Sequence, residues 1–313
     1  MGLLLDKIGE KLVDRWLTLL VLPGALFLAV TIAGAALGQS HALDVHRLAA
    51  VLTGWARSPA VADLGGQLVL LAATLAGSAC ASLLARSIGA VLQRGVLGAD
   101  WRDWPSPLRR VAQRRTATRA ARWSEAADAY NALRRLAAAA RGAGERADAT
   151  ARRAALHAMM RIAAEAPDRP TWSGDRVHAA AVRLDRDHAI ELDVVWPHLW
   201  LVLPDSTRDA VTAAASGLDQ ATVLGGWALL LAPVGWWWWP ALPIAAAFAA
   251  VCRHRVRAGA DLYAQLLEAA VRVHAGELAA QLGLDHAGPL DAALGEDLTR
   301  LLLTRVPPPP PAA

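Results

Sequence analysis

The sequence predicts an all-α fold: an integral membrane protein with four transmembrane helices and a mainly helical cytoplasmic domain. Hydrophobic residues make up 55% of its 313 positions and gather in long runs without charge. These runs are long enough to cross a hydrocarbon core of ~30 Å, which takes about 20 helical residues. The basic residues beside them fall on one predicted side of the membrane, as the positive-inside rule requires.

The first two uncharged runs each predict one transmembrane helix. Trp16–Leu37 has 22 residues and Gly65–Ala85 has 21. A cleaved signal peptide is the alternative for the first run, but its apolar part usually spans only roughly 7 to 15 residues. Residues 16–92 are therefore assigned to transmembrane helices 1 and 2, with an external loop over 38–64. An amphipathic N-terminal helix is expected over 1–15.

The third run, Ala221–Cys252, contains four consecutive tryptophans followed by Pro240. One helix over these 32 residues would rise about 48 Å, more than a bilayer needs. Trp rings prefer the headgroup level, and Pro240 disfavours helix at the residue before it. A transmembrane hairpin is therefore predicted over 220–252. Its outer turn, at the membrane interface, is formed by Trp236, Trp237, Trp238 and Trp239. A re-entrant hairpin is the alternative, because each leg is short.

Basic residues orient these helices. They cluster before the first run, after the second and after the third: Lys7, Lys11, Arg15; Arg86, Arg94, Arg102; Arg253, Arg255, Arg257. The loop over 38–64 has only Arg47 and Arg57. Four crossings place all three clusters on the cytoplasmic side. Both termini are then cytoplasmic. Heavy use of Ala and of Arg in place of Lys is typical of a bacterial chain, so the inner (plasma) membrane is the expected location.

Small residues at helical spacing occur inside the first two runs. Gly34 and Gly38 are four residues apart, as are Gly77 and Ala81. Such pairs allow helix backbones to approach closely in lipid. They are predicted to be helix-packing residues, either between copies in a homo-oligomer or within one four-helix set.

The region 93–219 is predicted to be a cytoplasmic helical domain. Two segments with apolar residues at i, i+3 and i+4 flank a break at Gly142 and Gly144, which predicts a helical hairpin. Upstream lies a segment with six arginines and no acid: Arg109, Arg110, Arg114, Arg115, Arg119 and Arg122. Contact with anionic headgroups and a solvated helix face are both open for this segment. Nucleic acid is disfavoured as a partner because no nucleic-acid motif accompanies the charge.

A motif follows this segment in the order Pro170-Thr171, Gly174-Asp175, Leu192-Asp193, Trp196-Pro197-His198-Leu199 and Leu203-Pro204. Over about 169–304 it resembles a family of uncharacterised bacterial multi-pass membrane proteins. In that family a similar segment precedes a membrane hairpin, and an amphipathic helix follows it. Asn is usual in place of Asp175, and Arg in place of His198. The resemblance implies the four-span topology and no activity. From the residues themselves, Asp193 is expected to cap a short helix, with Trp196 and Trp200 on one face.

The C-terminal part is predicted to form cytoplasmic amphipathic helices over 253–306 and a polyproline tail over 307–313. Gly283 is expected to end the first of these helices. The tail is read either as a docking motif or as a disordered end.

The sequence contains no recognised catalytic motif, so no enzyme, cofactor or metal is predicted. His274 and Glu277 are three apart on a helix, but two ligands do not make a metal site; His286 and Asp285 are the only added candidates. Four carboxylates gather near Arg183 and Arg186: Asp185, Asp187, Glu191 and Asp193. They are expected to be solvated or salt-bridged and not a general acid–base pair.

The predicted function is that of a non-enzymatic inner-membrane anchor, scaffold or signalling or defence partner for a cytoplasmic protein. A channel or transporter component is the alternative, disfavoured because the uncharged runs contain no ionisable side chain for coupling. An enzyme without a short motif is the third class. The lipid bilayer, its anionic headgroups, a second copy of the chain and a cytoplasmic protein are the expected partners.

Overall fold

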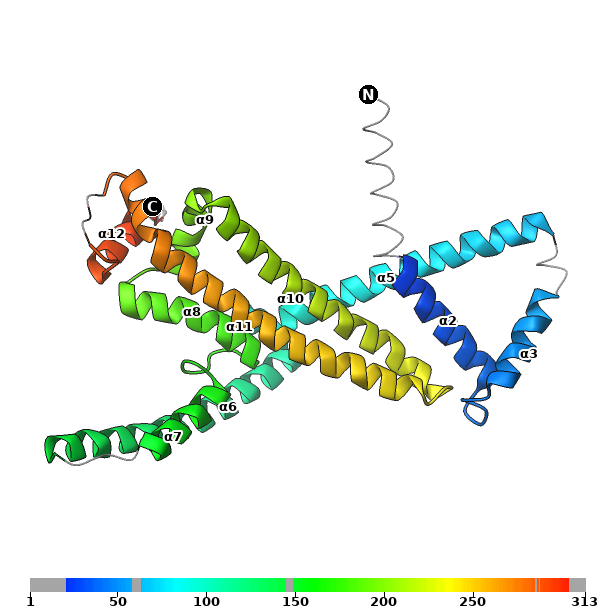
Figure 1. The fold of residues 1–313 in the computed structure, drawn as a ribbon, viewed down its shortest axis with the longest axis horizontal. Coiled ribbons are helices and arrows are strands. Elements are labelled where there is room, and N and C mark those ends of the chain that lie inside the picture. Colours follow the sequence, from blue (N-terminus) through cyan, green and yellow to red (C-terminus); the bar gives the residue numbers. More distant parts are fainter. Residues whose placement is uncertain (1–20, 58–62, 145–148, 285, 287, 304–313) are drawn as a thin grey trace, which may run out of the picture. The chain divides into compact units, whose positions relative to one another are not determined.

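The computed structural model describes residues 21–57, 63–144, 149–284, 286 and 288–303, and the fold of these residues is all-helical (Figure 1). They form ten α-helices and no strand. The amphipathic helix expected over 1–15, residues 16–20 of the first run and the polyproline tail over 307–313 lie outside the described residues.

The chain divides into two compact units. Unit 1 contains the described residues up to Gln93 together with Asp219–Arg255. Unit 2 contains Arg94–Leu218 and the described residues from Val256 onward. The sequence predicts segment boundaries after residues 92, 219 and 252, close to the points at which the chain passes between the units.

Unit 1 is built from five helical segments. They are α2 (Leu22–Leu37), α3 (Val45–Ala56), the first part of α5 (Leu64–Leu97), the end of α10 (Asp205–Leu231) with a 3-10 turn η3 (Ala232–Trp236), and the start of α11 (Ala241–Gln281). The uncharged run over 221–252 is thus divided between α10 and α11, with the tryptophans at the turn.

Two features of unit 1 differ from the sequence-based expectation. The loop over 38–64 contains the helix α3, which Asp44 caps by accepting a hydrogen bond from the backbone N–H of Arg47 at 2.9 Å. The second leg of the hairpin does not end at Cys252. It continues without a break into the C-terminal amphipathic helix, and together they form one 41-residue helix, α11. No proline lies between Pro243 and the end of α11 at Gln281, so nothing in the basic segment Arg253–Arg257 stops the helix.

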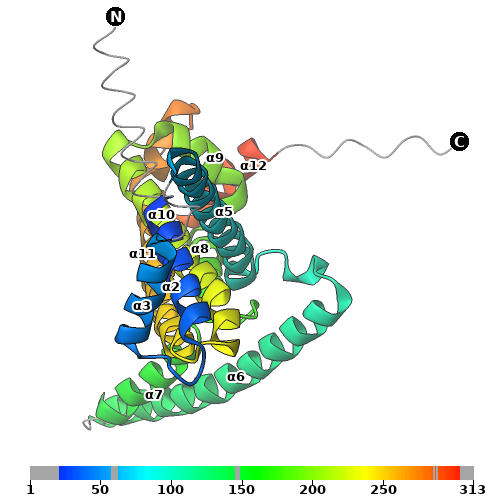
Figure 2. The ribbon, with the colours of Figure 1, turned by 90° about the vertical axis from the view of Figure 1, so that its right-hand side faces the viewer.

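Unit 2 packs its helices around a conventional apolar core. Besides parts of α5, α10 and α11, it contains α6 (Ser106–Gly142), α7 (Ala149–Ile162), α8 (Trp172–His188), α9 (Leu192–Val202) and α12 (Ala292–Leu302). The core includes fully buried side chains from α8, α9, α11 and α12, among them Leu184, Val195, Leu199, Val271 and Leu298. Helices α6 and α7 lie side by side as a hairpin (Figure 2). The chain turns after Gly142, and Gly144 adopts a positive φ of 78°.

The short helix after Asp193 begins earlier than the sequence predicts. Glu191 precedes the first residue of α9, so Asp193 lies in the first turn and is not the cap. Pro197 lies inside the helix and not in its first turn. Trp196 and Trp200 do share a face, with ring centroids 5.7 Å apart. Gly283, with a φ of 76°, follows the end of α11.

Candidate functional site

The apolar side chains of α5 are exposed, and they form the first candidate site. In the part of the chain that the structure describes, α5 is the one helix long and apolar enough to cross a membrane. Only 22% of its most apolar stretch is buried within the protein. The large side chains left uncovered are Leu64, Leu68, Val69, Leu70, Leu71, Leu83, Leu84 and Val91. A core helix buries such side chains, whereas the described residues of the chain leave these uncovered.

Helix α2 adds to this surface. Its described part is 16 residues long and uncharged, with Leu22, Leu26 and Ile32 exposed. Helices α10 and α11 contribute the exposed Leu229, Leu242 and Val251. We call the exposed apolar side chains of these four helices in unit 1 the apolar surface.

The tryptophan turn lies between α10 and α11. Trp236 is 89% exposed, and Trp237 and Trp239 are exposed as well. Trp238 is half-buried and differs from its neighbours, because its indole N–H donates to the carbonyl oxygen of Ala42 at 2.9 Å. The turn therefore presents three indoles outward and uses the fourth to hold the loop after α2.

The side-chain amide of Gln39 forms hydrogen bonds to the backbone of the tryptophan turn. Its amide nitrogen donates to the carbonyl oxygens of Gly235 at 3.2 Å and Trp236 at 2.8 Å, and its amide oxygen accepts from the N–H of Trp239 at 3.1 Å. These bonds satisfy backbone groups that the helices leave free where η3 ends. Sequence reasoning missed Gln39. The sequence signal that could have identified it is its position, because a polar amide side chain follows an apolar run there.

The small residues predicted for helix packing have different roles. A Cβ on Gly34 would lie 2.9 Å from the Cβ of Trp238, and one on Gly77 would lie 3.1 Å from a methyl carbon of Leu28. Ala81 is buried beside Ala85 and Trp227. These three residues pack within unit 1. Gly38 does not pack: nothing lies within 4 Å of its Cβ position, and its φ of 66° ends α2.

The closest helix approaches in unit 1 occur at glycines that the sequence reasoning did not single out. A Cβ on Gly226 would overlap the carbonyl oxygen of Ala85, and one on Gly24 would overlap that of Ser78. A Cβ on Gly89 would lie 3.0 Å from the backbone of Val223. Helices α2 and α10 therefore approach α5 backbone to backbone, which is the packing that small residues allow in lipid.

We expect Gly226→Ala to destabilise unit 1 by about 1–3 kcal/mol, because α5 and α10 must separate to admit the methyl group. The matched control is Gly217→Ala on the same helix. Nothing lies within 4 Å of the Cβ position of Gly217, so this change should stabilise by up to about 1 kcal/mol through helix propensity. Thermal unfolding of the purified full chain in detergent measures both. Equal midpoints for the two variants would contradict the close approach.

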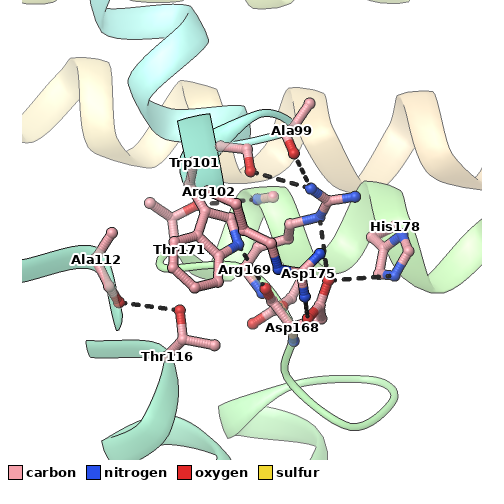
Figure 3. A network of polar contacts seen from close by, with 12 residues as sticks. Ala99, Trp101, Arg102, Ala112, Thr116, Asp168, Arg169, Thr171, Asp175 and His178 are labelled. Carbon is pink, nitrogen blue, oxygen red and sulfur yellow. Dashed lines mark hydrogen bonds and ion pairs between the residues drawn. The ribbon is translucent and has the colours of Figure 1, made fainter. Parts of the chain in front are cut away.

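The second candidate site is a polar network in unit 2, centred on Asp175 (Figure 3). This carboxylate is buried. One oxygen accepts from the backbone N–H groups of Asp168 at 2.9 Å and Arg169 at 2.7 Å, and the other accepts from the Arg119 guanidinium at 2.5 Å. Burial raises the pKa of Asp175, while the bonds from Arg169, Arg119 and Asp168 oppose that rise. Asp175 thus fixes the loop before α8 and joins it to α6.

The same loop satisfies the end of α5. The Arg169 guanidinium donates to the carbonyl oxygens of Gly98 and Ala99, and the Thr171 hydroxyl donates to that of Val96. The indole N–H of Trp101 donates back to the carbonyl oxygen of Asp168 at 2.9 Å (Figure 3). The last carbonyls of a helix lack partners within it, and a cation there is favoured by the helix dipole. This arrangement ties the C-terminal end of α5 to the loop before α8 within unit 2.

Residues of the sequence motif therefore have identifiable structural roles. Thr171 caps α8 by accepting from the N–H of Gly174 at 3.0 Å, and Gly174 leaves no room for a Cβ beside the carbonyl of Leu97. Val195, Leu199 and Leu203 lie in the core of unit 2. These residues cap a helix, allow a close approach or fill the core of unit 2, and this pattern is that of fold determinants.

Ion pairs join α8 to α11. Arg176, which is nearly buried, contacts Asp261 at 2.5 Å and Glu268 at 3.4 Å. Arg183 bridges Glu268 at 3.3 Å and Glu165 at 3.0 Å. One member of the predicted carboxylate cluster, Asp187, also forms ion pairs. It contacts Arg186 at 2.9 Å and Arg272 at 3.5 Å. Asp185, Glu191 and Asp193 are exposed.

The predicted basic residues are placed as follows. Arg253 and Arg255 are exposed at the end of unit 1, and Arg257 stacks its guanidinium 4.9 Å from the centre of the Trp172 ring in unit 2. Most of the six arginines at the start of α6 are exposed. Arg119 is the exception, because it turns inward to Asp175.

The His and carboxylate residues considered as metal ligands are placed as follows. His274 and Glu277 bond to each other at 2.9 Å. No group of three or more His, Cys, Asp or Glu side chains there could hold a metal ion. Asp285 lies outside the described residues.

Comparisons with protein-family models, with curated protein sequences and with solved structures find no match to this chain.

Proposed function

We propose that the protein is a multi-pass membrane scaffold. Unit 1 lies in the bilayer with four crossings, and unit 2 is displayed in the cytoplasm, where it binds a protein partner. The membrane is the inner membrane of a bacterium, and both termini lie on its cytoplasmic side. No chemistry is assigned to the chain.

The exposure of the apolar surface carries this proposal. Unit 2 buries leucines in a core and covers its buried charges with partners, as a water-facing domain does. Unit 1 does the reverse: its long helix α5 leaves most of its apolar side chains uncovered. Acyl chains supply the missing cover, and an α-helix satisfies its own backbone there.

The positions of the charged residues in unit 1 independently support the proposed membrane location and orientation. Within unit 1, the charged residues of α5, α10 and α11 lie near the points where the chain passes into unit 2: Arg86, Asp219, Arg253 and Arg255. The exposed indoles of the tryptophan turn lie at the opposite end of the α10–α11 pair. Indoles at one interface and arginines at the cytoplasmic one are the expected pattern for a membrane hairpin.

The four-span orientation is tested by accessibility of single cysteines. Ser40→Cys lies in the loop after α2, and Ser206→Cys lies in the first turn of α10 within unit 2. Both side chains are exposed, and the native Cys80 and Cys252 are replaced by Ser in the parent. We expect a membrane-impermeant maleimide added to intact cells, once it has passed the outer membrane, to label Ser40→Cys only. Ser206→Cys should react only after the inner membrane is opened.

Two outcomes would overturn parts of this proposal. Labelling of both cysteines from the same side would contradict the orientation. Selective ion flux through liposomes containing the pure protein would replace the scaffold function with that of a channel and leave the topology intact. Co-purification of a defined cytoplasmic protein, lost when the exposed face of unit 2 is altered, would support the scaffold.

A further inference from the structure

Helix α3 has an apolar face that the described residues of the protein leave largely exposed. No residue of α3 is buried. Val45, Leu52 and Trp55 are all at least half exposed, and with Leu48 they recur at the three- and four-residue spacing of one helix face.

The opposite face of α3 is polar. It carries His46, Arg47 and Thr53, and the Arg47 guanidinium contacts the ring nitrogen of His41 at 2.8 Å. The helix is therefore amphipathic along its whole length, yet neither face packs into a core. In a water-soluble protein the apolar face of such a helix is normally directed to the interior.

Hydrogen bonds to the tryptophan turn fix the position of the loop from which helix α3 starts. The loop before it is bound to the tryptophan turn by Gln39, and by Ala42, whose carbonyl oxygen accepts from Trp238. Figure 1 shows α3 turning away from the direction of α2 at this end. The start of the helix thus lies at the same end of unit 1 as the exposed indoles of Trp236, Trp237 and Trp239.

These observations favour lipid as the occupant of the apolar face over a second copy of the chain. A 12-residue helix is about 18 Å long. One face of it is far smaller than the ~800 Å² that each partner usually contributes to a stable protein interface. The face instead presents exposed apolar side chains of the same kind as those of the apolar surface of unit 1.

We propose that α3 is an interfacial helix, lying in the boundary between headgroups and acyl chains of the outer leaflet. Val45, Leu48, Leu52 and Trp55 face the acyl chains, and His46 and Arg47 face the headgroups and water. Helices of this kind bury one face about 5–10 Å into that boundary. This inference rests on the proposed membrane location of unit 1 and adds the lipid contact of a segment otherwise expected to be an external loop.

The test uses single cysteines in the full chain, with Cys80 and Cys252 replaced by Ser. Leu52→Cys and Ala50→Cys form one pair on opposite faces of α3, and Val45→Cys and His46→Cys form a second pair; all four positions are exposed. Leu71→Cys on α5 reports the membrane location itself. Each variant is labelled with an environment-sensitive fluorophore in detergent and reconstituted into phosphatidylcholine vesicles containing nitroxide lipids.

We expect the labels at Leu52 and Val45 to be quenched at least about twofold more strongly than those at Ala50 and His46, because only one face enters the lipid. Strong quenching at Leu71 with equal quenching on both faces of α3 would overturn the interfacial helix and leave unit 1 in the membrane. Absence of quenching at Leu71 would overturn the proposed function and this inference together. Shielding of Leu52 that increases with the protein-to-lipid ratio would assign the face to a second copy and overturn the lipid contact.

Discussion

Leu71→Arg is expected to reduce the membrane-inserted fraction of the chain by at least about tenfold. Leu71 lies in the uncharged part of α5 and is 56% exposed on the apolar surface. Replacing Leu with Arg in a membrane helix costs about 2–3 kcal/mol on insertion scales, depending on depth. The measurement is flotation: the share of expressed chain that rises with liposomes in a density gradient.

The matched control is Leu136→Arg on α6 in unit 2. Leu136 is 66% exposed, so the same substitution is made at a similarly open helical position. If unit 2 faces water, this variant should float like the parent, with stability within about 0.5 kcal/mol of it. The two variants are distinguished only by what surrounds them. Equal flotation of Leu71→Arg and Leu136→Arg would mean that both positions face water.

Asp175→Ala should destabilise unit 2 by about 3 kcal/mol. The change leaves the backbone N–H groups of Asp168 and Arg169 without their acceptor and Arg119 without its partner. Buried groups without partners cost about 1–3 kcal/mol each, and the cost at Arg119 is reduced because its side chain is 22% exposed. In a unit of this size the thermal midpoint should fall by roughly 6–12 °C.

Asp185→Ala is the control for Asp175→Ala. Both aspartates belong to α8, but Asp185 is exposed near its C-terminal end. Removing a carboxylate there should be neutral or slightly stabilising, since negative charge is unfavourable at a helix C-terminus. Asp175→Asn, which retains one acceptor oxygen, should fall between the parent and Asp175→Ala. A midpoint for Asp175→Ala equal to that of Asp185→Ala would show that the network does not stabilise the loop.

The contribution of Asp175 to the free energy of unfolding depends on pH, and the pKa shift of this carboxyl gives the direction of the change. Burial, the largest cause, raises the pKa of this carboxyl in the folded protein above its ordinary value of 3.8. The folded state then binds the proton more tightly than the unfolded state does. The resulting contribution to stability is complete below pH 3.8 and is lost as the pH rises through the higher folded pKa. Asp175→Asn should remove this decline, which denaturation at a series of pH values above 3.8 would detect.

Much of the helical layout follows from local sequence. Pro240 and the indoles beside it predict a break in the third uncharged run, and the structure has a turn there between α10 and α11. Gly142 and Gly144 predict the turn between α6 and α7. Both signals are residues whose backbone preferences act within a few positions, which is why a single sequence reveals them.

Other parts depend on contacts between distant residues and could not be predicted in this way. Nothing near Asp175 in sequence reveals that Arg119 is its partner, 56 positions away, or that Gln39 bonds to a turn almost 200 residues later. The continuity of α11 was missed for a different reason. A change from apolar to basic composition indicates the end of an apolar segment, whereas a helix ends only where its backbone or its caps require it.

The role of small residues shows the same limit. Gly34 and Gly38 look equivalent in the sequence, but one packs against Trp238 and the other ends a helix. Gly226 carries no distinguishing spacing, yet it allows the closest approach of α10 to α5. Spacing on one helix indicates which residues share a face. It does not identify which face meets a neighbour.

The central claim is that unit 1 is covered by lipid, and extraction of membranes with alkaline carbonate tests it most directly. Membranes from cells that express the unaltered full chain are washed at high pH, which releases soluble and peripheral proteins. The apolar surface of α5 and the α10–α11 pair predicts that the chain stays in the membrane pellet until detergent is added. Its release into the wash as a folded, monodisperse protein would contradict the membrane location and every orientation derived from it.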